Sequence, residues 1–174
     1  LLADEHDPEM RARCLDLLGE SARASANKLK FFRLAFGAAG GFGDEVDTRE
    51  ARAAIEGLFG GDGRIALGWM VEEPVMSKAA LKVLLNIVLI AGDALVRGGR
   101  LDVGAEKHDG GLDIVVRAEG SRIVLDPELK SVLVGETGED EVAPRAAAAW
   151  LVHCLVEEGQ GRIQVADGEE GMLL

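Results

Sequence analysis

The 174-residue sequence contains no tyrosine, and aromatic residues make up only 4% of it. This scarcity disfavours surfaces that stack nucleic acid bases, because such surfaces are built from exposed aromatic rings. Basic residues are also in deficit, with 19 Lys and Arg against 31 Asp and Glu and a net charge of −12. Binding to phosphate backbones needs clustered Lys and Arg, so nucleic acid is excluded as the main partner.

Long hydrophobic runs are missing as well. No apolar stretch reaches about 18 residues without a charge, which predicts no membrane-spanning helix and no membrane partner. The first residues have neither the basic region nor the apolar core of a signal peptide. Cys14 and Cys154 both lie in helix-like stretches, which indicates reduced core residues of a cytoplasmic protein. The sequence opens on Leu1 rather than Met, so we expect it to be part of a longer protein.

What the sequence does contain falls into two segments of different charge. Residues 1–43 hold six basic and six acidic side chains, whereas residues 44–174 hold 13 basic and 25 acidic ones. The boundary is the glycine-rich stretch 37–43, which can end a helix and act as a short flexible joint. Hydrophobic residues make up 48% of the chain, enough to bury a core. We therefore expect two structural parts.

The first segment predicts one long helix over residues 8–36. Asp7 is a suitable N-cap, and Pro8 suits the first helical position. Apolar residues recur at three- and four-residue spacing, and a second apolar row widens the stripe beyond what a two-stranded coiled coil needs. Such a stripe is typical of a four-helix bundle and predicts a hairpin partner helix upstream of Leu1, although ordinary packing inside the chain remains the alternative. The expected core of this bundle is Leu15, Leu18, Leu29, Phe32 and Phe36.

The second segment alternates helical and strand-like patterns. Ser77 is the expected N-cap of its most apolar helix. The order of the elements fits a sheet covered on one face by helices, which makes the predicted fold class α+β. We expect helices over 47–59, 78–95 and 144–158, a helical turn after Pro127, and strands over 64–71, 99–106, 112–118, 121–125, 161–166 and 170–174.

One local feature stands out against the acidic background. Residues 22–37 contain four basic side chains and no acidic one. Arg23, Asn27, Lys30 and Arg33 recur at helical spacing, so we expect them to share one exposed face. Two interpretations stay open. The face is either simply solvated, with basic residues favoured near the C-terminal end of a helix, or it is a docking strip for an acidic protein surface or a phosphoryl group.

A search for catalytic motifs finds little. His6, His108 and His153 are far apart in the sequence, and no Cys or carboxylate accompanies them at metal-ligand spacing, so no metal site is expected. A Ser-His-Asp or Cys-His site has no nucleophile-elbow motif to support it. There is no phosphate-binding Walker loop either.

Residue patterns in both segments point to one family. They comprise the stretches 21–23, 29–37, 76–78 and 85–99, with Trp69 and Pro74 between them. In this combination they resemble the ChpT-type histidine phosphotransferases of alphaproteobacterial cell-cycle phosphorelays, over essentially the whole chain. The resemblance implies a protein with the fold of a histidine kinase that has lost its ATPase activity. Helical hairpins pair in a homodimeric four-helix bundle, a histidine on the first helix carries the phosphoryl group, and the C-terminal domain resembles the ATP-binding sandwich of kinases.

For this chain the resemblance implies a dimerisation and phosphotransfer hairpin in residues 1–43 and an ATPase-like domain in residues 44–174. The family receives phosphate from the receiver domain of a hybrid histidine kinase and passes it to response regulators. The Mg²⁺ for that transfer would belong to the partner receiver domain. Combined with the basic strip, this gives an expected partner-binding surface of Arg23, Asn27, Lys30, Phe31 and Arg33.

The ATP-binding motifs of related kinases are degenerate. Asn86 matches the first asparagine of their metal-binding helix, but Ile90 stands where the second should be, and an aliphatic side chain cannot ligate Mg²⁺. The stretch 117–122 keeps one glycine of the adenine-binding motif, and residues 142–148 replace the lid glycines. We therefore expect no ATP or other cofactor, and we interpret Asn86 as a buried amide that holds local backbone.

The family's phospho-accepting histidine lies in a His-Asp motif on the first helix. His6 and Asp7 imitate this motif but lie at the expected hairpin loop, so the motif is not carried over to His6. The acceptor is expected about four turns before the loop, upstream of Leu1 and level with residues 23–30. No catalytic residue is then expected within the chain. Two alternatives stay open: a divergent GHKL-type ATPase or kinase, and a non-catalytic dimeric adaptor.

Overall fold

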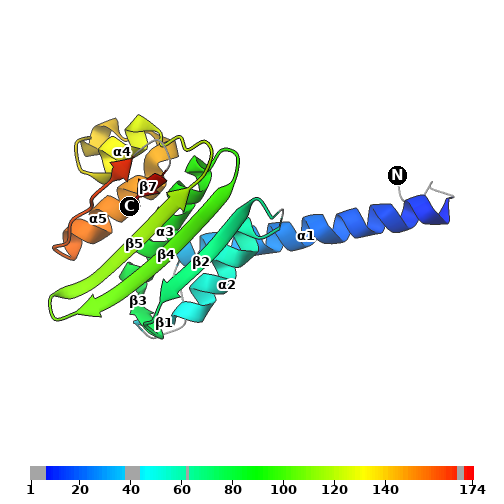
Figure 1. Ribbon diagram of the computed structural model, residues 1–174, viewed down its shortest axis with the longest axis horizontal. Coiled ribbons are helices and arrows are strands. Elements are labelled where there is room, and N and C mark those ends of the chain that lie inside the picture. Colours follow the sequence, from blue (N-terminus) through cyan, green and yellow to red (C-terminus); the bar gives the residue numbers. More distant parts are fainter. Residues whose placement is uncertain (1–6, 38–43, 62, 168–170) are drawn as a thin grey trace.

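The computed structural model describes residues 7–37, 44–61, 63–167 and 171–174. Within these ranges a long helix projects from a mixed domain of helices and strands (Figure 1). Predictions that fall on residues 1–6, among them His6 and the expected hairpin loop, lie outside the described residues, as does the joint over residues 38–43.

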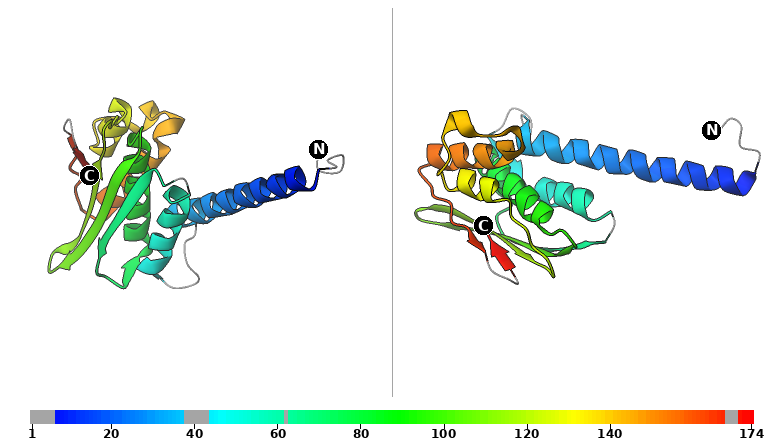
Figure 2. Two further views of the ribbon diagram at one scale, coloured as in Figure 1. Left: turned by 45° about the vertical axis from the view of Figure 1, so that its right-hand side comes forward. Right: turned by 90° about the horizontal axis from the view of Figure 1, so that it is seen from above.

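The projecting helix is α1 (Pro8–Phe36) and has the predicted bounds. The Asp7 side chain accepts a hydrogen bond from the Glu9 backbone N–H at 3.0 Å, and Pro8 occupies the first turn, where it removes no helical hydrogen bond. The helix ends where the Gly37 N–H bonds to the Arg33 carbonyl. Its N-terminal part extends well beyond the domain, while its last turns enter the domain's core (Figure 2).

The domain is built on a five-stranded sheet in the order β2-β4-β5-β7-β6. Strands β2 and β4 are parallel, and the remaining neighbours are antiparallel. A separate two-stranded antiparallel sheet joins β1 (Glu45–Asp47) to β3 (Val75–Ser77). The strands of the larger sheet are β2 (Ile65–Val71), β4 (Gly99–His108), β5 (Gly111–Glu119), β6 (Ala166–Asp167) and β7 (Gly171–Leu173).

The helices lie on one face of this sheet, and the other face is open (Figure 2). The central helix is α3 (Lys78–Ala94), which begins where the Ser77 hydroxyl accepts a hydrogen bond from the Ala80 N–H. Its apolar side chains, such as Leu81, Leu84 and Val88, are fully buried. The other helices are α2 (Thr48–Phe59), α4 (Pro127–Leu133) and α5 (Ala147–Glu158), with 3-10 turns η1 (Glu139–Glu141) and η2 (Pro144–Ala146).

The predicted strand over residues 121–125 is not formed. Ile123 makes only an isolated bridge with Leu95, and the Val124 N–H bonds to the Ala94 carbonyl. The backbone of this stretch therefore satisfies the C-terminal end of α3 instead of joining a sheet.

Other predicted bounds were wrong by up to five residues. The last two strands cover 166–167 and 171–173, and the helix expected from residue 144 starts as a 3-10 turn and becomes α-helical at Ala147. Strands β1 and β3 were not predicted, because three-residue strands are too short for an alternating pattern to be read.

Candidate functional site

The predicted dimer-core stripe lies on the outer side of α1. Leu15, Leu18 and Leu29 are 54%, 54% and 73% exposed, and Phe32 and Phe36 are 42% and 41% exposed. The rings of Phe32 and Phe36 stack on each other with centroids 5.9 Å apart. Packing inside the described part of the chain therefore does not explain the stripe. A continuous apolar stripe of this size on a projecting helix is typical of an interaction surface.

The opposite side of α1 joins the core of the domain. Phe31, Leu34 and Ala35 are 0–2% exposed and pack with buried side chains of the domain. The prediction that Phe31 belongs to a partner-binding surface is therefore wrong, because a fully buried ring offers no surface to a partner. Phe31 instead anchors the helix, and its ring meets that of Phe32 edge to face at a centroid distance of 5.7 Å.

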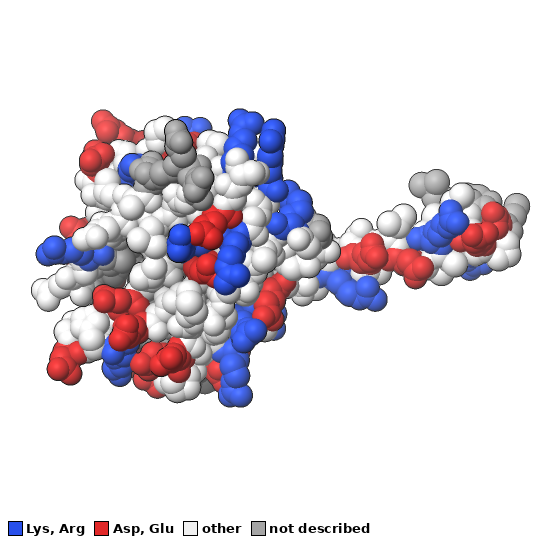
Figure 3. All heavy atoms as spheres, viewed as in Figure 1, with Lys and Arg blue, Asp and Glu red and all other residues white. Residues whose placement is uncertain are grey.

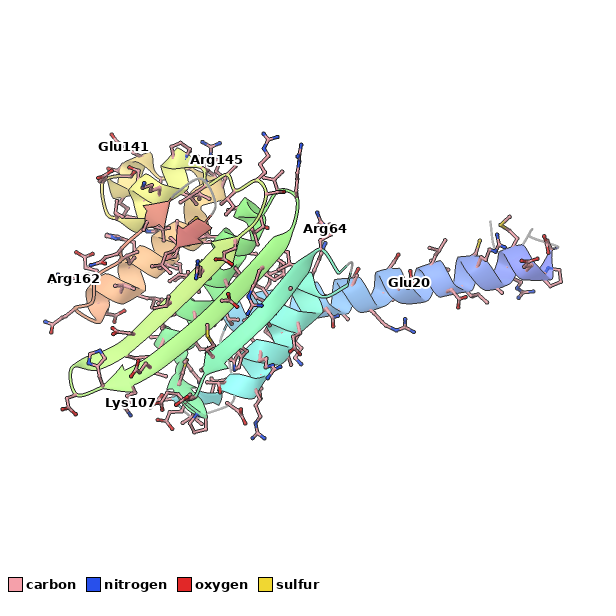
Figure 4. The ribbon with its side chains drawn as sticks, viewed as in Figure 1. Glu20, Arg64, Lys107, Glu141, Arg145 and Arg162 are labelled. Atoms are coloured by element: carbon pink, nitrogen blue, oxygen red, sulfur yellow. The ribbon has the colours of Figure 1, made fainter. Side chains whose placement is uncertain are left out.

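A groove of about 680 Å³ lies where α1 leaves the domain. Figure 4 labels Glu20 on α1 and Arg64 at the start of β2, the elements that form its two walls. The wall from α1 consists of Glu20, Ser21, Arg23, Ala24, Asn27 and Lys28. The wall from the domain consists of Gly57, Leu58, Phe59, Gly61, Arg64 and Ile65.

The groove has an apolar floor and a mainly basic rim. Leu58, Phe59 and Ile65 are half-buried and supply the floor. The rim carries three basic residues and one acidic residue, in a chain whose net charge is −12. Figure 3 shows Lys and Arg gathered on the side of the domain from which α1 projects. This arrangement suits an acidic partner surface that also has apolar contacts to offer.

Only part of the predicted basic strip lies in the groove, and the rest is exposed to solvent beyond it. Arg23 and Asn27 line the groove, but Asn27 is half-buried rather than exposed, because it packs against Gly57 of α2. Lys30 and Arg33 are exposed beyond the groove. The side chains of Arg23, Lys30 and Arg33 form no ion pair with the residues that the structure describes, so their charges are available to a partner.

Asn86 holds backbone, as predicted. Its side-chain amide donates to the Ala35 carbonyl at 3.0 Å and to the Lys82 carbonyl at 2.8 Å, and the residue is fully buried. Ile90, one turn later, is 4% exposed and belongs to the core. These contacts give α3 two structural roles, packing of the core and attachment of α1.

Residues 142–148, the predicted counterpart of the kinase lid, include positions that are held by charged contacts. Arg145 of η2 pairs with Glu128 and, at 3.4 Å, with Asp126, both at the N-terminal end of α4. The Glu128 carboxylate also accepts a hydrogen bond from the Ala143 N–H at 3.3 Å. The hydrogen bond to Glu128 raises the pKa of Arg145. These contacts tie α4 to the start of α5.

The described residues contain no group of three or more His, Cys, Asp or Glu that could hold a metal ion. The Nε2 atom of His108 lies 3.3 Å from a carboxylate oxygen of Asp113, and that of His153 lies 3.7 Å from one of Glu157. Both cysteines are free thiols, and burial raises the pKa of Cys154, which keeps it protonated.

No helix in the described ranges has the length and apolarity needed to cross a membrane.

Comparison with known proteins agrees with this geometry. Residues 48–171 match the family model of the histidine phosphotransferase C-terminal domain. The chain belongs to this family. It is 29% identical over 149 residues to the protein phosphotransferase ChpT of Brucella abortus (strain 2308), covering 86% of this chain and 71% of that protein.

Two solved structures place the fold. That of a bacterial phosphotransferase has a TM-score of 0.82 at 26% identity, covering 99% of this chain and 80% of that one. The histidine kinase domain of a blue-light activated kinase from Erythrobacter litoralis has a TM-score of 0.53 at 16% identity, covering 95% and 79%. The predicted ChpT-type family, kinase-like α+β fold and histidine phosphotransferase function are confirmed.

Sequence reasoning missed the wall that the domain contributes to the groove. Gly57 interrupts the helical pattern of α2 without ending it, which signals a close approach to another element. Arg64 follows a glycine-rich turn and gave no signal of its own. Only the position of α1 in the structure brings Arg64 and Arg23 to the same groove.

Proposed function

We propose that this protein is a homodimeric, cytoplasmic phosphorelay intermediate that accepts a phosphoryl group from the receiver domain of a hybrid histidine kinase and passes it to response regulators. The observation that carries the proposal is the two-sided character of α1. One side is rooted in a kinase-like domain through Phe31, and the other presents Leu15, Leu18 and Leu29 to a bundle partner.

The phospho-accepting histidine is supplied by a helix N-terminal to residue 1 that packs on the exposed stripe. The described histidines lie at the end of β4 and on α5, whereas the stripe lies on α1. In an antiparallel hairpin, a histidine about four turns from the loop stands level with residues 23–30, beside the basic groove. The proposed acceptor and the proposed docking charges then meet at one place.

The chemistry needs no metal from this chain. A neutral imidazole nitrogen attacks the aspartyl phosphate of the donor receiver in line, so that an N–P bond forms and the acyl O–P bond breaks, releasing the aspartate carboxylate. The second receiver's aspartate reverses this step and regenerates the imidazole. Mg²⁺ bound by the receiver would neutralise the charge on the transferred group. Arg23, Lys28 and Arg64 attract the acidic surface around that ion and raise the rate of encounter.

ATP is not part of the proposed cycle. Asn86 is committed to two backbone carbonyls, Ile90 is a core residue, and Arg145 closes the lid segment onto α4. We expect Mg²⁺-ATP to leave the melting temperature unchanged. A clear rise would favour the divergent ATPase or kinase instead.

The test is phosphoryl transfer from a phosphorylated receiver domain. The protein extended upstream of Leu1 should acquire an acid-labile, base-stable label, and the chain of residues 1–174 should acquire none. Label on neither protein would favour the non-catalytic adaptor. A monomeric mass for the extended protein in light scattering would contradict the dimer.

Charge reversal tests the docking surface. Arg23→Glu and Arg33→Glu in the extended protein should each slow transfer by about tenfold or more without changing the mass of the dimer. The matched control is Lys107→Glu at the far end of the sheet (Figure 4), which reverses a charge away from the groove. Equal rates in all three variants would remove the basic residues of α1 from docking.

A further inference from the structure

The basic groove exists only while α1 keeps its angle to the domain. One wall is made by residues of α1 and the other by the end of α2 and the start of β2. The helix projects beyond the groove, so its direction is set by the turns that pack on the domain, which include Asn27 against Gly57 of α2 and the buried last turns (Figure 2). Whatever holds those turns also sets the width of the groove.

Apolar burial supplies part of this hold. Phe31, Leu34 and Ala35 are buried against the domain. Apolar contacts are non-directional, however, and tolerate small rotations and shifts of a helix better than hydrogen bonds do. Burial alone therefore keeps α1 attached without selecting one orientation.

A directional contact is made at the end of the helix. The last carbonyls of a helix have no partner within it. The Arg33 carbonyl is satisfied by the Gly37 N–H, and the Ala35 carbonyl accepts from Asn86 of α3. The same amide group donates to the Lys82 carbonyl of α3 itself. One planar NH₂ group thus joins the end of α1 to the middle of the central helix.

Burial of this amide costs free energy, which indicates that it does more than stabilise the packing of α1. The side-chain oxygen of Asn86 is buried and has no hydrogen-bond partner among the described residues. Leaving a buried polar atom unpaired is unfavourable, and an apolar side chain would fill the same space without that cost. A buried amide does, however, favour the single arrangement in which its donors meet their acceptors.

We propose that Asn86 is a positioning residue that fixes α1 relative to the ATPase-like domain, so that the groove between Arg23 and Arg64 is formed before any partner binds. The position that holds metal and nucleotide in kinases then sets helix geometry here. This inference rests on the proposed function only for its effect on transfer. Its effect on helix orientation is independent of that function.

The orientation is measured as a distance between spin labels in the extended protein. The labels replace the exposed residues Asp16 on α1 and Ala66 on β2, after Cys14 and Cys154 are changed to Ser and Ala. Labelled chains are diluted into unlabelled ones so that only distances within a chain contribute. The labelled protein with Asn86 unchanged should give one narrow distance distribution. A broad distribution in this protein would overturn the proposal regardless of the results for the variants.

Variants test the role of the amide. Asn86→Ala should broaden the distance distribution. Asn86→Leu, which keeps the side-chain volume and removes both donors, should broaden it as well, and it provides the test in case the alanine variant does not fold. The control is Val116→Ala, which removes fully buried volume from β5 without touching Asn86's hydrogen bonds and should leave the distribution narrow. A distribution as narrow in Asn86→Leu as in the native protein would overturn the proposal.

Transfer kinetics supply the functional test. Loss of a buried hydrogen bond, with its acceptor left unpaired, shifts the equilibrium between two orientations of α1 by roughly five- to 100-fold. Asn86→Leu should therefore raise the KM for the receiver domain about fivefold or more while kcat stays within about twofold, and Val116→Ala should change neither. Equal KM values in Asn86→Leu and native protein would contradict the proposal. Absence of transfer in the native extended protein would refute the proposed function and leave the distance result to decide the role of Asn86.

Discussion

Asn27 of α1 and Gly57 of α2 touch so closely that a Cβ added to Gly57 would stand 3.0 Å from the Cγ of Asn27. The contact lies in the wall of the basic groove and brings the two helix backbones together. A glycine inside a helix costs about 1 kcal/mol relative to alanine. The close approach of α1 explains why glycine is present at this position of α2.

Substitution of Gly57 tests this contact. Gly57→Val should lower the free energy of unfolding by about 1–2 kcal/mol, because its branched side chain must displace Asn27. Gly57→Ala should be close to neutral, since the gain in helix propensity offsets a contact with a flexible side chain. Urea denaturation measures both. Ala53→Val on the exposed side of α2 is the control for the cost of a branched side chain in this helix, and a Gly57→Val variant as stable as the native protein would contradict the contact with Asn27.

Phe31 and Phe32 are neighbours with opposite roles. Phe31→Ala should destabilise the chain by about 3–5 kcal/mol, because it empties a fully buried site. Phe32→Ala should cost below about 1 kcal/mol in the same urea experiment, since its ring is 42% exposed.

The order should reverse in an assay of the dimer. Phe32→Ala should weaken self-association of the extended protein, measured by sedimentation, because its ring belongs to the exposed stripe. If Phe32→Ala left the dimer as tight as native protein, this part of the stripe would not lie in the interface.

The same two residues show what the sequence could and could not predict. Local signals such as Asp7, Pro8 and Gly37 fix the ends of α1, so its bounds were predicted correctly. The repeat spacing also placed Phe32 and Phe36 on one stripe. It could not show that Phe31 is buried, because this depends on where α2 and α3 pack, which is a long-range property.

The candidate site was predictable to a similar degree. The degenerate kinase motifs led to the prediction that Asn86 is a buried amide, because an aliphatic residue such as Ile90 cannot ligate Mg²⁺. Its partner, the Ala35 carbonyl, lies 51 positions away in the sequence and could not be inferred from spacing. The groove was missed for the same reason, since Arg23 and Arg64 meet only through the packing of α1 against α2.

Asp93 predicts a pH-dependent stability. The residue as a whole is exposed, but partial burial of its carboxyl raises the pKa above the ordinary value, so the folded state mildly disfavours the charged form. The residue also lies in the last turn of α3, where the helix dipole opposes a negative charge. A raised folded-state pKa means that stability is highest below the unfolded pKa and falls as the pH rises through the folded value.

Asp93→Asn should therefore stabilise the protein by about 0.5 kcal/mol at pH 7. The difference should vanish near pH 3, where the aspartate is protonated in both states. Unfolding in urea at the two pH values measures it. The exposed Glu106→Gln on β4 serves as control, and a gain for Asp93→Asn that persisted at the lower pH would contradict the electrostatic origin.

Gly98 lies against the backbone of Arg64, one of the residues that line the groove. It has a φ of +77°, and a Cβ there would lie 2.3 Å from the Arg64 carbonyl oxygen, which already accepts a hydrogen bond from the Gly99 N–H. Gly98→Ala should cost about 2–4 kcal/mol, because it adds left-handed strain to a collision with backbone. Gly63→Ala is the matched control, with a φ of +65° and open space around it, and should cost about 1 kcal/mol. Equal losses in thermal unfolding would show that the left-handed conformation alone sets the cost, whereas a larger loss at Gly98 would show the added cost of the collision with the Arg64 backbone.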